Sequence, residues 1–293
     1  MRVFVTGATG FIGSAVVREL LGAGHSVLGL ARSDAGAESL TSVGAKVHRG
    51  DLNDLESLRT GAAASDAVIH CAFIHDFSKF KENCEIDGRA IEALGDALAG
   101  SGRILIVSTG TGALAPGRVA TEDMEAPRHP AMPRVSEQTG LAQLSRGVNV
   151  SVVRLPQVHD TVKQGLVTYA IQIAREKGVS AYIGDGHNRW PAAHVDSVAR
   201  LYRLALEKHE AGSRYHAVAE EGVTMREIAE ATGRGLKLPV VSLSPEEAQA
   251  HFGWLAMFAA LDMPASSAQT RQKLGWNPAG PGLIEDLSNM RYF

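Results

Sequence analysis

The stretch that decides the fold is Val3-Phe-Val-Thr-Gly-Ala-Thr-Gly-Phe-Ile-Gly13. It places Gly7, Gly10 and Gly13 between an apolar strand and a helix that we expect over residues 11–21. A chain that turns from strand to helix beside a dinucleotide needs one glycine for the tight turn, a second where the pyrophosphate approaches, and a third where helix and strand pack closely. The free N–H groups of the helix's first turn then face the anion. The spacing predicts a nucleotide-binding site, with a purely structural turn as the alternative.

The composition limits the class of protein. The chain has 293 residues and a formal net charge of −3, which fits one large α/β domain or one domain and a half and argues against a nucleic-acid partner. No apolar run approaches the length of a membrane span, and the first strand begins at the first residues, so we expect a cytoplasmic protein without membrane contact. The two cysteines, Cys71 and Cys84, lack metal-ligand spacing, and we predict no metal site.

Apolar β-rich runs alternate with helical segments in the first half of the chain. The runs cover residues 3–6, 26–31, 46–48, 67–71, 104–108 and 150–155. This alternation predicts an α/β Rossmann fold, a doubly wound parallel sheet with helices on both faces. We assign residues 1–155 to this core, with a further strand and helix from near 190–218, and most of 156–293 to a smaller, mainly helical substrate-binding part. Within that part, 224–227 and 244–247 fit capping boxes that start two helices.

Six short motifs follow one another in a fixed order along the chain. They are Gly7-Ala-Thr-Gly-Phe-Ile-Gly13, Gly50-Asp-Leu52, Val68-Ile-His-Cys-Ala72, Ile106-Val-Ser-Thr109, Val153-Arg-Leu-Pro156 and His194-Val-Asp196. This ordered set resembles the extended and atypical short-chain dehydrogenase/reductases, a superfamily that includes the NAD-dependent epimerase/dehydratases. The resemblance covers nearly the whole chain.

The resemblance implies a role for several of these positions. The glycine turn would hold the pyrophosphate, Asp51 and Leu52 would flank the adenine, Cys71 and Ala72 would pass under the ribose and phosphates, and Pro156 would lie beside the nicotinamide. A turn-forming or helix-capping aspartate is the alternative for Asp51. The full set of cofactor contacts that we predict comprises Gly7, Thr9, Gly10, Phe11, Ile12, Gly13, Arg32, Ser33, Asp51, Leu52, Cys71, Ala72, Phe73, Ser108, Glu137 and Pro156.

The end of the second predicted strand indicates which nicotinamide cofactor binds. An acidic residue there would accept both ribose hydroxyls, whereas an arginine forms a paired hydrogen bond with a 2′-phosphate. The chain reads Leu30-Ala31-Arg32-Ser33 at this point, with no carboxylate before Asp34. The sequence therefore favours NADP over NAD. The alternative is that Arg32 is only a solvated cation.

The catalytic pair typical of the resembled superfamily is missing. Its members use a tyrosine whose pKa is lowered by a lysine four residues later. Tyrosine occurs here only at positions 169, 182, 202, 215 and 292, and none is followed by lysine at that distance. An alignment of residues 133–137 puts Pro133 in the tyrosine position and Glu137 in the lysine position. Glu137 would accept a ribose hydroxyl, but it cannot activate a phenol as lysine does.

Candidates for a replacement follow the predicted strands, because chemistry in an open parallel sheet occurs beyond the carboxyl ends of its strands. We predict that Thr109 or Thr111 polarises the substrate oxygen, and that His75 or His159 handles the proton near neutral pH. Each histidine has an ordinary loop residue as its alternative. Trp190 follows a polar turn and is expected either to wall the cleft or to pack in the core.

These observations leave more than one function open. The first is an NADP(H)-dependent oxidoreductase that transfers hydride to or from a small carbonyl or alcohol with a non-standard proton donor. A second, from another class, is a non-catalytic NADP(H)-binding redox sensor or scaffold. A sugar-nucleotide epimerase or dehydratase is a weaker alternative, because those reactions demand a strong base. The expected partner is a small-molecule substrate, and a homodimer is possible.

Overall fold

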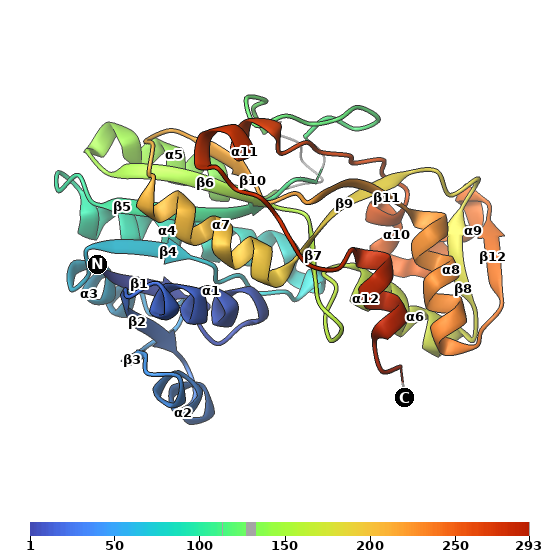
Figure 1. The fold of residues 1–293 in the computed structure, drawn as a ribbon, viewed down its shortest axis with the longest axis horizontal. Helices are drawn as coiled ribbons and strands as arrows, with labels where there is room; N and C mark the ends of the chain where they lie inside the picture. Colours follow the sequence, from blue (N-terminus) through green and yellow to red (C-terminus); the bar gives the residue numbers. More distant parts are fainter. Residues whose placement is uncertain (113, 127–132, 293) are drawn as a thin grey trace.

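A seven-stranded parallel sheet forms the centre of the protein (Figure 1). The computed structural model describes residues 1–112, 114–126 and 133–292. The strands lie in the order β10-β6-β5-β4-β1-β2-β3. Their bounds are β1 Arg2–Thr6, β2 Ser26–Ala31, β3 Lys46–Arg49, β4 Ala67–His70, β5 Ile104–Gly110, β6 Asn149–Leu155 and β10 Arg214–His216. The predicted Rossmann fold is confirmed, and the strand order reverses beside β1, where such sheets open a crevice for ligands.

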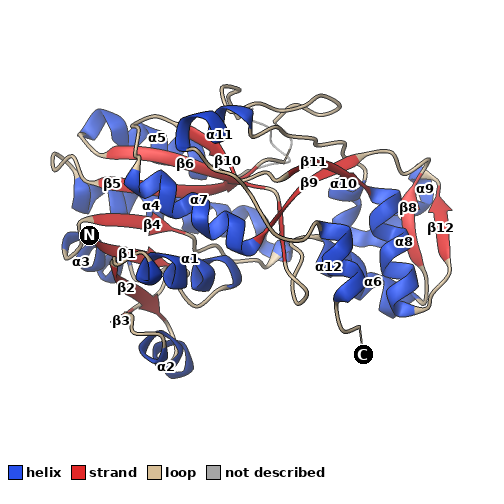
Figure 2. Cartoon of the chain, viewed as in Figure 1, coloured by secondary structure: helices blue, strands red, loops and turns tan. Residues whose placement is uncertain are grey.

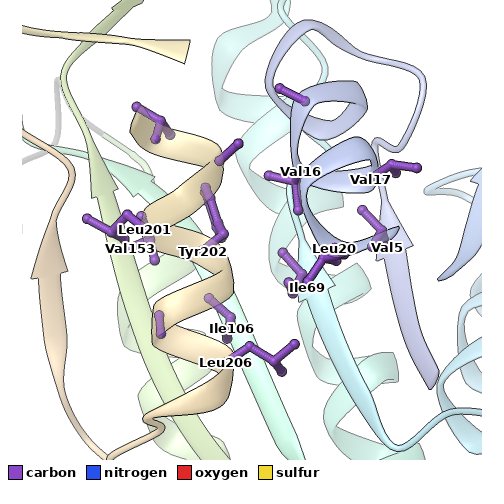
Figure 3. Packing of buried hydrophobic residues seen from close by; sticks show 14 of the residues in the cluster. Val5, Val16, Val17, Leu20, Ile69, Ile106, Val153, Leu201, Tyr202 and Leu206 are labelled. Atoms are coloured by element: carbon purple, nitrogen blue, oxygen red, sulfur yellow. The ribbon is translucent and has the colours of Figure 1, made fainter. Parts of the chain in front are cut away.

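Helices cover both faces of this sheet (Figure 2). One face carries α1 (Phe11–Gly22) and α7 (Val195–Glu207), which pack side by side, with α2 (Asp34–Ser42) towards the β3 edge. The other face carries α3 (Leu55–Ala63), α4 (Phe80–Leu98) and α5 (Ser136–Ala142). Figure 3 shows Val16 and Leu20 of α1 and Leu201 and Tyr202 of α7 within one apolar cluster. Burial of these side chains is what fixes the helices on the sheet.

The C-terminal unit lies beyond the carboxyl ends of the central strands (Figure 1). Its helices are α6 Val167–Lys177, α8 Met225–Leu236, α9 Pro245–Phe252, α10 Ala256–Ala259 and α12 Leu283–Asn289, and α11 Ala268–Leu274 packs near β10. Two small sheets complete it, formed by β7 Gln157–His159 with β9 Arg189–His194 and β11 Glu220–Thr224, and by β8 Ser180–Ile183 with β12 Val240–Leu243.

Both predicted capping boxes are present. The Thr224 hydroxyl accepts from the Glu227 backbone and the Glu227 side chain accepts from the Thr224 backbone, and Ser244 and Glu247 do the same at α9. His194 is the N-cap of α7, because its ring accepts from the Asp196 N–H, and Asp196 places an acidic side chain in the first turn of the helix. Among the described residues, no helix combines the length and the apolar composition needed to cross a membrane.

Candidate active site

The glycine turn between β1 and α1 is shaped by backbone contacts that leave no room for side chains. Gly7 has a φ of +66°, and a Cβ there would lie 2.7 Å from the Ala72 nitrogen. A Cβ on Gly13 would lie 2.0 Å from the Gly7 carbonyl oxygen. A Cβ on Gly10 would meet only that same oxygen, at 3.2 Å. Gly7 and Gly13 therefore close the turn, and Gly10 leaves its outer side open.

The start of α1 presents unpaired donors at this opening. In the described part of the chain, the backbone N–H groups of Phe11, Ile12 and Gly13 have no acceptor. The N-cap Gly10 contributes no side-chain hydrogen bond, and the first turn holds no acidic residue. Thr9 and Gly10 are exposed. The partial positive charge of the helix terminus is thus available to an external anion, which fits a diphosphate.

The residues expected near the adenosine have different environments. Arg32 is exposed directly after β2 and forms no hydrogen bond or ion pair with any described residue. The Ser33 hydroxyl caps α2 by accepting from the Gly36 N–H at 3.2 Å. The Asp51 carboxylate accepts from the Asn53 N–H at 2.7 Å. This contact is the one expected of a turn-forming aspartate, which was the alternative to an adenine contact. Of these, only Arg32 has a charge with no partner in the described residues.

The end of β4 passes beneath the glycine turn. Cys71 and Ala72 meet Gly7 through backbone atoms, as the close approach of its Cβ position shows. Burial raises the pKa of the Cys71 thiol to about 12, although Ser108 and Tyr202 act against it. The thiol therefore stays protonated and is not a nucleophile. Phe73 follows as a half-buried side chain at the rim, and Pro156 is half-buried between β6 and β7.

The end of β5 supplies the predicted hydroxyls. The Ser108 hydroxyl donates to the His70 carbonyl at 2.6 Å and lies 2.6 Å from the Tyr202 hydroxyl, so it belongs to the core and not to a cofactor contact. Thr109 points to the opposite face because strand side chains alternate. The Thr111 hydroxyl donates to the Leu155 carbonyl at 3.3 Å. Thr109 thus has a hydroxyl without a partner among the described residues.

A buried chain of polar groups connects the glycine turn to α5. The Thr6 hydroxyl lies 2.8 Å from His70 Nδ1, and His70 Nε2 lies 3.1 Å from Asp87. The Ser136 hydroxyl donates to the second Asp87 oxygen at 2.5 Å. Burial raises the pKa of Asp87, but the hydrogen bonds and charges of its neighbours outweigh this and hold the pKa below its ordinary value. His70 is thus a hydrogen-bonded core residue.

This chain ends on Arg134, which sequence reasoning missed. Its Nε donates to the Ser136 hydroxyl at 2.8 Å, and its Nη2 lies 3.4 Å from the Ser108 carbonyl oxygen. Its guanidinium lies 3.8 Å from the centre of the Phe73 ring. Burial lowers the pKa of Arg134, but it stays charged because a guanidinium titrates far above physiological pH. The sequence held one clue to Arg134: it directly follows Pro133, which takes the place of the catalytic tyrosine in the alignment.

Glu137, which fills the lysine position in the alignment, has a different partner from the predicted one. Both of its carboxylate oxygens accept from Arg154, at 2.8 and 2.7 Å, and Arg214 donates to one of them at 2.7 Å. The carboxylate is buried between these two arginines. Glu137 is therefore a structural ion-pair residue. The prediction that it accepts a ribose hydroxyl is wrong, because both of its carboxylate oxygens are taken by arginines.

The two candidate histidines also differ. His159 is fully buried in β7, and its Nδ1 lies 2.6 Å from the Asp286 carboxylate, so it is a core residue and not the proton donor that we predicted. His75 is exposed after β4 beside Phe73. Desolvation and the charge of Arg134 lower the pKa of His75, so the protonated form that could donate a proton is less populated than in a free histidine. Trp190 is fully buried, so of its two expected places, the wall of a cleft and the core, the structure shows the core.

Residues 3–219 match the model of the NAD dependent epimerase/dehydratase family. The chain belongs to the NAD-dependent epimerase/dehydratase family. This family member is 49% identical over 295 residues to the Uncharacterized protein C2A9.02 of Schizosaccharomyces pombe, with 100% of both chains covered. It is 28% identical over 247 residues to the 2-alkyl-3-oxoalkanoate reductase of Stenotrophomonas maltophilia, covering 78% of this chain and 73% of the other.

The fold of this epimerase/dehydratase-family chain is also similar to a solved structure. The UDP-glucose 4-epimerase of Thermus thermophilus, solved in complex with NAD, gives a TM-score of 0.76 at 22% identity, covering 100% of this chain and 99% of the other. Family membership makes the protein an enzyme of the NAD(P)-dependent oxidoreductase type with a nicotinamide dinucleotide cofactor. The glycine turn fits that cofactor, because its unpaired N–H groups and open side at Gly10 match a diphosphate.

Proposed function

We propose that the protein is an NADPH-dependent reductase of a small carbonyl compound. The observation that carries this proposal is the charge at the end of β2, where Arg32 has no partner among the described residues and no carboxylate lies between the start of β2 and Asp34. A free guanidinium matches a 2′-phosphate in charge and in paired donor geometry. The name of the Stenotrophomonas maltophilia relative, a reductase, supports the direction of the reaction.

Arg32→Ala is expected to raise the dissociation constant of NADPH about tenfold to a hundredfold, because a charge-assisted contact is worth about 1.5–3 kcal/mol. The dissociation constant of NADH should change less than about threefold, since NADH has no 2′-phosphate. Titration calorimetry with both coenzymes measures the two values. Arg59→Ala is the matched control, because Arg59 lies on α3 and already pairs with Glu56 and Asp96. Equal losses for both coenzymes would remove Arg32 from the 2′-phosphate.

The same proposal assigns the substrate oxygen to Thr109. When bound, the reduced nicotinamide supplies a hydride to the carbonyl carbon, and the electron pair of the C=O bond moves to the oxygen. A hydroxyl donor that faces this oxygen stabilises its negative charge until it takes a proton from water. Thr109 stands at the carboxyl end of β5 with its hydroxyl unpaired among the described residues. Thr111 is the weaker choice because its hydroxyl already has an acceptor.

Thr109→Val should lower kcat about a hundredfold, which is the usual effect of removing one donor from a developing oxyanion. The dissociation constant of NADPH should stay the same, because valine preserves the shape of the side chain. The measurement is NADPH oxidation against a panel of aldehydes, ketones and imines. Thr41→Val is the control, since Thr41 is exposed on α2 and bonds to the Ala37 carbonyl. No turnover by the wild-type protein on any carbonyl in a broad panel would refute the reductase.

A further inference from the structure

Arg134 lies beside Phe73 and the Ser108 carbonyl, near the carboxyl ends of β4 and β5, without a direct ion pair among the described residues. The Asp87 carboxylate reaches it only through the Ser136 hydroxyl. Its Nε and Nη2 have partners, whereas its Nη1 has no hydrogen bond within the described ranges. The chain of buried groups behind Ser136 fixes the direction of the guanidinium. Arg134 is therefore a positioned cation with donors still available.

An aromatic cluster lies beside this cation. Phe73, whose ring Arg134 covers, contacts His75 edge-on with ring centres 5.3 Å apart. Phe77 stacks on Trp254 with ring centres 4.3 Å apart and an angle of 9° between the planes. Tyr169 of α6 and Phe258 of α10 contact the same Phe77 ring edge-on. The cluster thus joins the loop after β4 to the C-terminal unit.

Part of this cluster is open to solvent. Trp254 is 40% exposed, although it stacks on Phe77. Phe73 and Phe77 are half-buried. An exposed indole that forms part of an aromatic wall is available to an apolar ligand, because further burial of its ring is favourable. The helical spacing of Trp254, Met257 and Phe258 is typical of a core or a subunit contact, and the exposure of Trp254 argues against the core.

Charged side chains of both signs lie in this region. Arg134 and Lys163, from the segment after β7, both act on His75 and lower its pKa. The carboxylates in the same region have partners of their own. Asp76 accepts from the Ser78 backbone and hydroxyl, Asp160 accepts from the Val162 and Lys163 backbones, and Asp87 accepts from Ser136. These carboxylates therefore accept hydrogen bonds from nearby groups, whereas Arg134 keeps an Nη1 without a hydrogen bond among the described residues.

We propose that Arg134 binds the carboxylate of an apolar oxo acid whose hydrophobic body packs on Phe73, Phe77 and Trp254. This inference deepens the proposed reductase and rests on it for the chemistry at the carbonyl. A guanidinium holds a carboxylate through two parallel hydrogen bonds, which positions a planar substrate as well as attracting it. A rigid aromatic wall next to that fork then selects a flat apolar body over a polar sugar.

Binding is tested without coenzyme by titrating the protein with benzoate and recording tryptophan fluorescence. Trp190 and Trp276 are buried, so the exposed Trp254 carries the ligand-dependent signal, and Trp254→Phe should abolish it. The benzoate signal should saturate, and Arg134→Gln should raise the dissociation constant at least about tenfold. Benzamide, which has the same shape without the charge, should bind the wild-type protein at least about tenfold more weakly.

Two variants keep this test decisive. Arg134→Lys retains the charge without the fork and should bind benzoate with intermediate strength, so it replaces Arg134→Gln if the glutamine variant fails to fold. Arg59→Gln should leave the benzoate titration unchanged, because Arg59 lies on α3 and pairs with Glu56 and Asp96. Equal binding of benzoate and benzamide, unchanged binding by Arg134→Gln, or no saturable signal would overturn the proposal.

Measurements of carbonyl reduction distinguish the carboxylate-binding role of Arg134 from the proposed reductase activity. With NADPH, phenylglyoxylate should be reduced with a kcat/KM at least about tenfold above that of its methyl ester, and Arg134→Gln should remove this preference. Reduction of both compounds with equal efficiency would retain the reductase and reject the role of Arg134. Arg134-dependent benzoate binding without reduction of any carbonyl would retain the binding site and reject the reductase.

Discussion

Gly13→Ala is expected to abolish coenzyme binding in the micromolar range. The added Cβ would lie 2.0 Å from the Gly7 carbonyl oxygen and 2.7 Å from its carbonyl carbon. Both are backbone atoms, so the strand-to-helix turn itself must move. Overpacking of this kind costs about 1–3 kcal/mol even in adaptable cores, and here it displaces the N–H groups that face the diphosphate. We expect the dissociation constants of NADPH and NADH to rise roughly a hundredfold or more.

Gly22→Ala is the matched control in the same helix. A Cβ on Gly22 would meet no atom within 4 Å, so calorimetry should show unchanged binding of both coenzymes. Thermal unfolding should show a loss of stability for Gly13→Ala and none for Gly22→Ala, because alanine is a better helix former than glycine. Wild-type affinity in folded Gly13→Ala would mean that the diphosphate does not lie at this turn.

The parts of the molecule that sequence predicted well have causes within a few residues. The glycine turn depends on the positive φ of Gly7 and on the close approach of Gly13 to the Gly7 carbonyl, and the two capping boxes depend on hydrogen bonds between residues three positions apart. Six of the central strands were predicted because each is a short apolar run between turns. The seventh, β10, lies in the 190–218 stretch from which a further strand was expected, but it has only three residues, and its pairing with β6 depends on distant contacts.

The candidate site was predicted less completely because its polar contacts join distant positions. Glu137 lies 77 residues from Arg214, and His159 lies 127 residues from Asp286. No local pattern shows that these side chains already have partners. Arg134 was missed for the same reason, because Ser108 and Phe73 become its neighbours only when the sheet forms. Motifs thus located the cofactor turn. Only the fold showed which charged side chains have no ion-pair partner among the described residues.

Residue type was also a weak guide to exposure among the large aromatics. Trp190 follows a polar turn, yet it is fully buried in β9. Trp254 lies at helical spacing with Met257 and Phe258, a pattern typical of a core, yet it is 40% exposed while Phe258 is 7% exposed. Helical spacing places residues on one face, but the partner of that face is set by tertiary packing.

The buried charge pair beneath the site gives the second large prediction. Glu137 holds Arg154, which is fully buried, and also accepts from Arg214. Arg154 further donates to the Met124 carbonyl at 2.7 Å, so this one guanidinium ties β6 to α5 and to the segment near residue 124. Glu137→Gln leaves a buried cation without its counter-charge. Breaking a buried pair in this way typically costs about 3–5 kcal/mol of the free energy of unfolding.

Urea unfolding at pH 7 measures this loss, and Glu56→Gln is the matched control. Glu56 faces Arg59 on the surface of α3 with its side chain 75% exposed. An exposed pair of this kind contributes about 0–1 kcal/mol, so the control should unfold almost as the wild type does. Should Glu137→Gln also lose less than about 1 kcal/mol, the buried network would not be a main support of the fold.

The pH dependence of the same pair has a definite sign. Burial raises the pKa of Glu137, but the hydrogen bonds and charges of Arg154 and Arg214 outweigh it and hold the pKa below 4.5. A carboxyl whose pKa is lower in the folded state stabilises the fold above its unfolded pKa, and this contribution disappears as the pH falls through the folded pKa. The difference in unfolding free energy between the wild type and Glu137→Gln should therefore be constant from pH 7 to about 5 and narrow only below about 4.5. His216, whose pKa burial lowers to about 4, is present in both proteins, so the comparison removes most of its contribution. A difference that stays the same down to pH 2 would show that Glu137 supports the fold through packing rather than through its charge.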